Sequence, residues 1–143
     1  MTRYVAGFLF EDCRQHVVLI RKNWPEWQRG KLNGLGGRIE PGETPASAMR
    51  REFQEETGVD IPDWKEFAVL TGTGFVLHFF YGCADWETIG RVSSLTDELV
   101  RTYQLNELGS LPTVPNAKWL IPKALPMEHD RAASFLIQAD VPP

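Results

Sequence analysis

Residues 4–11 are rich in strand-forming residues, with Val5, Gly7 and Leu9 alternating with Ala6, Phe8 and Phe10, and hydrophobic residues are concentrated again over residues 16–22, which is typical of β-strands. The short polar segment between these runs predicts that the two strands form a hairpin. Three later runs rich in strand-forming residues predict further strands over residues 65–71, 75–84 and 98–105.

The segment between these two groups of strands carries the clearest helical pattern of the chain. Glu43 or Thr44 can cap its first turn, Pro45 suits an early helical position, and Gly58 can end it. Two more helices are predicted over residues 119–125 and 128–139, interrupted by Pro122 and Pro126, with loops over residues 23–30, 85–97 and 108–115. Strands, an acidic helix, more strands and a final helix predict an α/β protein whose mixed sheet lies between helical layers.

Composition narrows the class of protein. The 143 residues show no repeat or linker, so one domain over residues 1–143 is expected. The net charge of −4 gives no reason to expect a nucleic-acid polymer as partner. No apolar run approaches the roughly 20 residues needed to cross a bilayer, and the N-terminus lacks the features of a signal peptide. A cytoplasmic protein without a membrane partner is therefore expected. Cys13 and Cys83 form neither a metal motif nor a disulfide framework.

Three acidic residues of the predicted helix suggest its chemistry. Glu52, Glu55 and Glu56 are spaced i, i+3 and i+4, so their carboxylates share one face. Such like charges repel and destabilise a helix, whereas a bound Mg²⁺ or Mn²⁺ would make the arrangement favourable. The glycine-rich approach at Gly34, Gly36 and Gly37 allows the backbone to come close to a metal or a phosphate. Taken alone, three glutamates at this spacing are more typical of a solvated helix surface.

The wider spacing resolves this choice. Residues 37–59 read GRIEPGETPASAMRREFQEETGV: Gly, five residues, Glu, seven residues, then Arg-Glu-apolar-x-Glu-Glu-x-Gly-apolar. This resembles the Nudix box in every fixed position, so the chain is similar to the Nudix hydrolases. The resemblance implies an α/β/α sandwich with a mixed central sheet, and hydrolysis of a nucleoside diphosphate linked to a group X with Mg²⁺ or Mn²⁺. It also implies a metal site formed by Glu52, Glu55, Glu56 and the carbonyl of Gly36. Arg51 would orient the catalytic glutamate, and Glu43 would support the loop–helix geometry.

Segments outside the box resemble the MutT-type enzymes that remove oxidised nucleoside triphosphates. The run KLNGLGGR, residues 31–38, implies that Asn33 contacts the base, and residues 96–99, TDEL, imply that Glu98 adds a carboxylate near the metals. The run PNAKWLIP, residues 115–122, resembles the segment that closes over the base and makes Asn116 and Trp119 candidate pocket residues. The sequence departs from the oxidised-purine enzymes there, because it has Pro115 and Asn116 where they have acidic residues.

Two basic residues are candidate phosphate contacts. Lys22 ends the second predicted strand and Arg38 follows the first glycine of the box; either is also compatible with a simple surface role. Trp24 and Trp27 precede the site in a loop, where they can stack on a base, pack within the loop or form an association surface.

These observations predict a nucleoside triphosphate pyrophosphatase that releases a nucleoside monophosphate and pyrophosphate. Its predicted catalytic residues are Arg51, Glu52, Glu55, Glu56 and Glu98, with Glu55 the first choice of base, followed by Glu98 and Glu56. A hydrolase of nucleotide conjugates, such as a nucleotide sugar, a dinucleoside polyphosphate or a reduced dinucleotide, is the alternative. A non-catalytic nucleotide-sensing module is a further alternative. The expected partner is a small nucleotide, and the protein is expected to be a monomer or a homodimer.

Overall fold

A computed structural model of the chain describes residues 1–125 together with the backbone of residues 135–138. Its strands are β1 (Thr2–Glu11), β2 (His16–Arg21), β3 (Leu32–Asn33), β4 (Leu35–Arg38), β5 (Lys65–Gly72), β6 (Phe75–Ala84), β7 (Leu99–Gln104) and β8 (Phe135–Gln138). Its α-helices are α1 (Pro45–Thr57), α2 (Trp86–Gly90) and α3 (Pro115–Ala124), with short 3-10 helices η1 (Glu26–Gln28) and η2 (Leu105–Ser110).

Strand β1 is the centre of a single mixed sheet. It pairs in parallel with β6 along its whole length, while its other edge pairs antiparallel with β4 in its first half and with β2 near its end. The order across the sheet is β3-β2-β1-β6-β5-β8, with β7 added on β2 and β4 on β1. Strand β4, which leads into helix α1, therefore lies directly beside the central strand β1.

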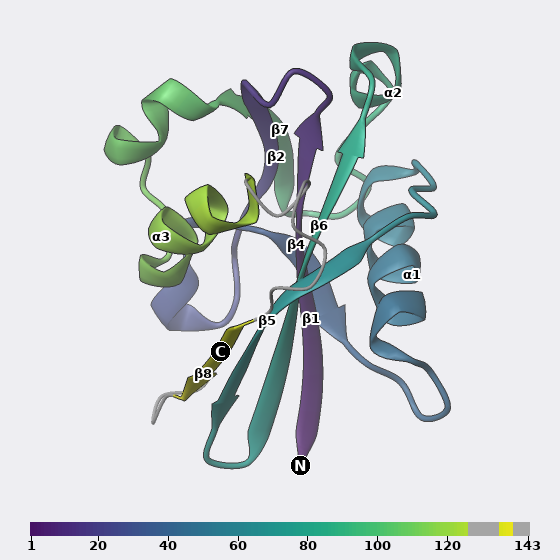
Figure 1. Cartoon of the computed structure of the whole chain (residues 1–143), viewed down its shortest axis with the longest axis vertical. Helices are drawn as coiled ribbons and strands as arrows, with labels where there is room; N and C mark the ends of the chain where they lie inside the picture. Colours follow the sequence, from purple (N-terminus) through teal and green to yellow (C-terminus); the bar gives the residue numbers. More distant parts are fainter. Residues whose placement is uncertain (126–134, 139–143) are drawn as a thin grey trace.

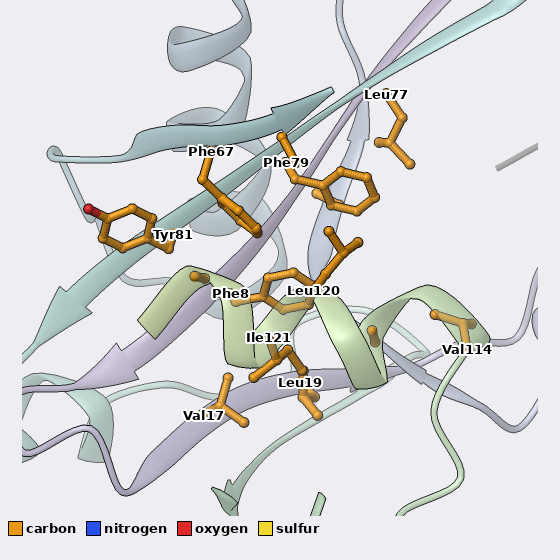
Figure 2. Close-up of a cluster of buried hydrophobic side chains, with 14 of the residues drawn as sticks. Phe8, Val17, Leu19, Phe67, Leu77, Phe79, Tyr81, Val114, Leu120 and Ile121 are labelled. Carbon is orange, nitrogen blue, oxygen red and sulfur yellow. The ribbon is translucent and has the colours of Figure 1, made fainter. Parts of the chain in front are cut away.

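Helices cover opposite faces of this sheet (Figure 1). Alternation along β1 sends Phe8 and Phe10 to one side and Val5 and Leu9 to the other. On the first side, aromatic residues of β1, β5 and β6 meet Leu120 and Ile121 of α3, with Phe8 among them (Figure 2). On the second side, Ala48, Met49 and Phe53 of α1 pack against the sheet. These two cores confirm the predicted mixed sheet between helical layers.

The ends of α1 form as the sequence predicts. Thr44 is the N-cap: its hydroxyl accepts a hydrogen bond from the backbone N–H of Ser47, and the Ser47 hydroxyl accepts one from the N–H of Thr44. Pro45 occupies the first turn, and Gly58 ends the helix with φ of 81°, a left-handed conformation that suits glycine. Local signals thus fix both ends of the helix that carries the acidic residues.

The C-terminal region differs from the prediction. The backbone of Phe135–Gln138 is a strand parallel to β5, so the helix predicted over residues 128–139 is wrong there, and its remaining residues lie outside the described part of the chain. Helix α3 begins at Pro115 instead of 119, because proline is accepted in the first turn of a helix. The loop predicted over residues 85–97 contains the short helix α2, capped by Asp85. No helix among the described residues has the length and apolar character required to span a membrane.

Candidate active site

The acidic face of α1 lies against the glycine-rich strand β4. The Gly36 backbone N–H donates a hydrogen bond of 3.0 Å to Glu56 Oε1. A Cβ added to Gly37 would lie 2.6 Å from the Glu52 carboxyl carbon, and one added to Gly36 would lie 1.9 Å from the Val5 carbonyl oxygen. Real Cβ contacts are not this short, so glycine at both positions lets the carboxylates and β1 approach the β4 backbone closely.

Arg51 holds most of the remaining acidic groups together. Its guanidinium donates to both carboxylate oxygens of Glu43, at 2.7 and 2.9 Å. It also donates to Glu52 at 3.0 Å, to Glu55 at 3.2 Å and to the Arg38 carbonyl oxygen at 3.0 Å. These bonds raise the pKa of Arg51 and, through the paired contact, lower the pKa of Glu43. Arg51 thus ties α1 to the end of β4, and Glu43 is its main anchor.

Glu56 has the most strongly shifted pKa among the acids of the site. Only 7% of the residue is exposed, and burial, reinforced by the negative charge of Glu52, raises its pKa to about 8. Lys22 and the Gly36 N–H act in the opposite direction, whereas Glu98 adds to the rise. Burial also raises the pKa of Glu52, partly offset by its bond to Arg51. Ionised carboxylates in this position are therefore costly unless further positive charge is supplied.

The chemical type of the donor atoms in this site suits a hard divalent cation. Carboxylate and carbonyl oxygens are the ligands that Mg²⁺ and Mn²⁺ prefer, and a cation would remove the cost of ionising the buried Glu56. Among the described residues, no three acidic, histidine or cysteine side chains are already arranged to hold a metal. The contacts explain this, because Arg51 engages Glu52 and Glu55 while Glu98 faces other donors. These side chains would have to turn from their present partners to bind a cation.

A pocket of about 470 Å³ adjoins the acidic cluster. Its wall includes Gly37 and four residues that the sequence predicts as metal or substrate contacts: Gly36, Lys22, Asn33 and Arg38. Residues 22–30, which we term the tryptophan loop, contribute Trp24 and Trp27, which are 72% and 41% exposed. Exposed aromatic rings beside a cluster of polar groups are suited to a ligand with a flat, partly polar base.

Asn33 is already oriented in this pocket. Its Nδ2 donates to Gln28 Oε1 at 3.1 Å, and its Oδ1 accepts from the Gly34 N–H at 2.8 Å. Gln28 is buried, and the sequence did not identify it as a site residue. The sequence also did not identify the pocket residues Tyr4 and Leu77. Neither of the latter carries a local signal, because each is an ordinary strand residue that reaches the pocket only through sheet pairing.

The other predicted residues lie in different surroundings. Glu98 accepts a hydrogen bond from Lys22 Nζ at 3.0 Å and another from the Asn23 N–H at 2.6 Å. Asn116 and Trp119 lie on α3 and are not among the residues that line the pocket. The start of α3 nevertheless lies near the site, because the Val114 N–H donates to the Leu32 carbonyl oxygen at 2.9 Å.

Comparison with known proteins identifies the family of the chain. The family model of the NUDIX domain matches residues 1–135. The MutT protein of Bacillus halodurans is 18% identical with a TM-score of 0.72, over 98% of this chain and 91% of that one. A MutT from work on Aliivibrio salmonicida and Vibrio cholerae has a TM-score of 0.74 at 18% identity, over 88% and 98% of the two chains.

The NUDIX domain of Shewanella oneidensis NrtR, in complex with ADP-ribose, is similar at a TM-score of 0.70 and 18% identity, over 88% of this chain and 87% of that one. At such identities the solved structures establish the shared fold. The family match covers nearly the whole chain and contains every box residue described above. The chain therefore belongs to the Nudix family of hydrolases.

Proposed function

We propose that this protein hydrolyses a phosphoanhydride bond of a nucleoside triphosphate, releasing a nucleoside monophosphate and pyrophosphate. One observation carries the proposal: the buried Glu56 carboxylate is bonded to Gly36, and Gly36 also lines the pocket with Lys22 and Asn33. The acidic cluster and the pocket therefore share one wall. A nucleotide whose base contacts Asn33 would direct its phosphates towards the glycines of β4 and the acids of α1.

Hydrolases of this family generally use divalent metal ions, and Mg²⁺ or Mn²⁺ fits the oxygen donors here. Glu52, Glu55, Glu56 and the Gly36 carbonyl are the residues that would hold the metal. When bound, the metal offsets phosphate charge and lowers the pKa of a water molecule. Arg51, held by Glu43, keeps a positive charge beside Glu52 and Glu55, while Lys22 and Arg38 offer positive charge to the phosphate oxygens. Glu55, the most exposed of the three acids, is proposed as the base that receives the proton from water.

The tryptophan loop and Asn33 are proposed to select the base. Trp24 and Trp27 offer exposed ring faces, and stacking on aromatic rings tolerates any base. The amide of Asn33, oriented by Gln28, offers the polar contact that discriminates between base edges. Asn116 and Trp119 remain proposed contacts that would require α3 and the base to approach each other.

The test is a panel of nucleoside triphosphates and nucleotide conjugates assayed with Mg²⁺, with phosphate and pyrophosphate quantified separately. The proposal expects pyrophosphate and monophosphate from triphosphates, and loss of turnover in excess chelator. Glu55→Gln should lower turnover by about 100-fold or more while leaving the fold unchanged. Glu87→Gln is the matched control, because Glu87 is an exposed acid on α2 and not part of this cluster. Release of orthophosphate alone would contradict the proposal.

A second candidate is hydrolysis of a nucleotide conjugate. The similar NrtR domain was solved with ADP-ribose, which contains the same phosphoanhydride linkage between a nucleoside and a second group. The pocket here is open to solvent along the exposed tryptophan loop, which leaves room for such a group. Turnover of conjugates without turnover of triphosphates in the same panel would select this second candidate.

A further inference from the structure

The segment that carries Glu98 is hydrogen-bonded to the C-terminal end of helix α1. In residues 93–98, the Ser93 N–H donates to the Thr57 carbonyl oxygen at 3.2 Å and the Leu95 N–H donates to the Glu56 carbonyl oxygen at 3.1 Å. These two bonds cap the C-terminal end of α1, where backbone carbonyls lack partners within the helix. The segment therefore occupies a fixed position relative to the buried Glu56.

The other end of the same segment is bonded to the tryptophan loop. Both carboxylate oxygens of Glu98 have a donor: Lys22 Nζ at 3.0 Å on Oε1 and the Asn23 N–H at 2.6 Å on Oε2. Asn23 returns a second bond, from its Nδ2 to the Asp97 carbonyl oxygen at 3.0 Å. The Glu98 side chain is only 14% exposed, so its ionic bond to Lys22 is well shielded from solvent.

The rest of the tryptophan loop has few comparable attachments. Its base is closed by the Gly30 N–H, which donates to the Lys22 carbonyl oxygen at 2.8 Å, and its buried Gln28 accepts a hydrogen bond from Asn33 of β3, whereas Trp24 and Trp27 are 72% and 41% exposed. Packing therefore does little to fix the ring positions relative to α1. The contacts of Glu98 with Lys22 and Asn23 supply that connection between the pocket and the helix.

We propose that Glu98 is a positioning residue of the nucleotide pocket: it fastens the tryptophan loop to the end of α1 and thereby sets affinity for the nucleotide. This inference rests on the proposed function for its substrate, and it assigns Glu98 a role other than the metal ligand or base that the resemblance implies. To bind a metal, Glu98 would have to give up the hydrogen bonds from Lys22 and Asn23 that define its present position.

The kinetic test compares Glu98→Ala with Glu98→Gln and with the control Asp97→Asn. Asp97→Asn removes the same charge one residue away and keeps the backbone carbonyl that Asn23 contacts. We expect Glu98→Ala to raise KM for the best nucleotide about tenfold, with kcat within threefold and the half-saturating Mn²⁺ concentration unchanged. Glu98→Gln, which keeps one acceptor, should lie between Glu98→Ala and wild type. A 100-fold loss of kcat with a higher Mn²⁺ requirement would overturn the proposal and make Glu98 a metal ligand.

Amide hydrogen exchange provides a readout that does not depend on turnover. Glu98→Ala should accelerate exchange across residues 22–30 at least tenfold, and Asp97→Asn should leave it unchanged. Unchanged exchange in both Glu98→Ala and Glu98→Gln would refute the fastening role. If the wild-type protein fails to hydrolyse any nucleotide, the proposed function fails, while the exchange experiment still decides the role of Glu98.

Discussion

The buried carboxylate of Glu56 makes the stability of the metal-free protein depend on pH. Its pKa is raised from 4.5 to about 8, chiefly by burial. The folded protein therefore holds this proton more tightly than the unfolded chain does. Its contribution to stability is fully present below pH 4.5, and it is lost progressively as the pH rises towards 8. Glu56→Gln removes the ionisation and keeps an oxygen that can accept the Gly36 N–H.

The size of the pKa shift of Glu56 sets the expected change in the free energy of unfolding. At 1.36 kcal/mol per pKa unit, the change from 4.5 to about 8 corresponds to a loss of at most about 5 kcal/mol in the free energy of unfolding. Relaxation of the site on ionisation reduces this limit. We expect Glu56→Gln to gain about 2 to 4 kcal/mol over wild type between pH 5 and pH 8.5.

The assay is urea unfolding of both proteins in excess EDTA at several pH values across this window. Glu55→Gln is the control, because it removes a neighbouring carboxylate of α1 that is exposed to solvent. Its stability relative to wild type should change little with pH. If the difference between wild type and Glu56→Gln were the same at pH 5 and pH 8.5, the burial argument for this carboxylate would be refuted.

Three further predictions follow from the contacts of the site. Gly37→Ala places a Cβ 2.6 Å from the Glu52 carboxyl carbon, so the Mg²⁺ concentration for half-maximal activity should rise about tenfold. Gly109→Ala is the control: its Cβ meets no atom within 4 Å, so this concentration should stay unchanged. Arg51→Lys cannot reproduce the forked pair of bonds to Glu43 together with the bond to Glu52, so turnover should fall about 100-fold in steady-state assays. Activity within twofold of wild type would contradict this. Gln28→Met removes the acceptor that orients Asn33, so KM should rise several-fold with little change in kcat, and unchanged preference among bases would argue against Asn33 as the base contact.

Part of this fold could be predicted from local features of the sequence. The capping residues Thr44 and Gly58 delimit α1, and the runs of strand-forming residues mark β1, β2, β5 and β6 close to their observed bounds. The parallel pairing of β1 with β6 has no local signature, since their paired residues are distant in the sequence. The apolar run Phe135–Gln138 is short enough to suit either a helix or a strand, and pairing with β5 decided in favour of the strand.

The residues of the site likewise fall into those that the sequence predicts together and those that only the fold brings together. Arg51, Glu52, Glu55 and Glu56 come from one helix, so their spacing alone predicted that they would lie together. Glu98 and Lys22 are 76 positions apart, and only the pairing of β2 with β7 brings them into contact. Gln28 gave no signal because its role depends on the path of a loop and on its contact with Asn33.

Direct measurement of Mn²⁺ binding by electron paramagnetic resonance tests the central claim, that the acidic face of α1 is a divalent-cation site. Titration at pH 8 should show the signal of free Mn²⁺ suppressed by the wild-type protein and by Glu87→Gln. Glu52→Gln and Glu56→Gln should each weaken binding at least tenfold. Equal Mn²⁺ affinity in all four proteins would contradict the account.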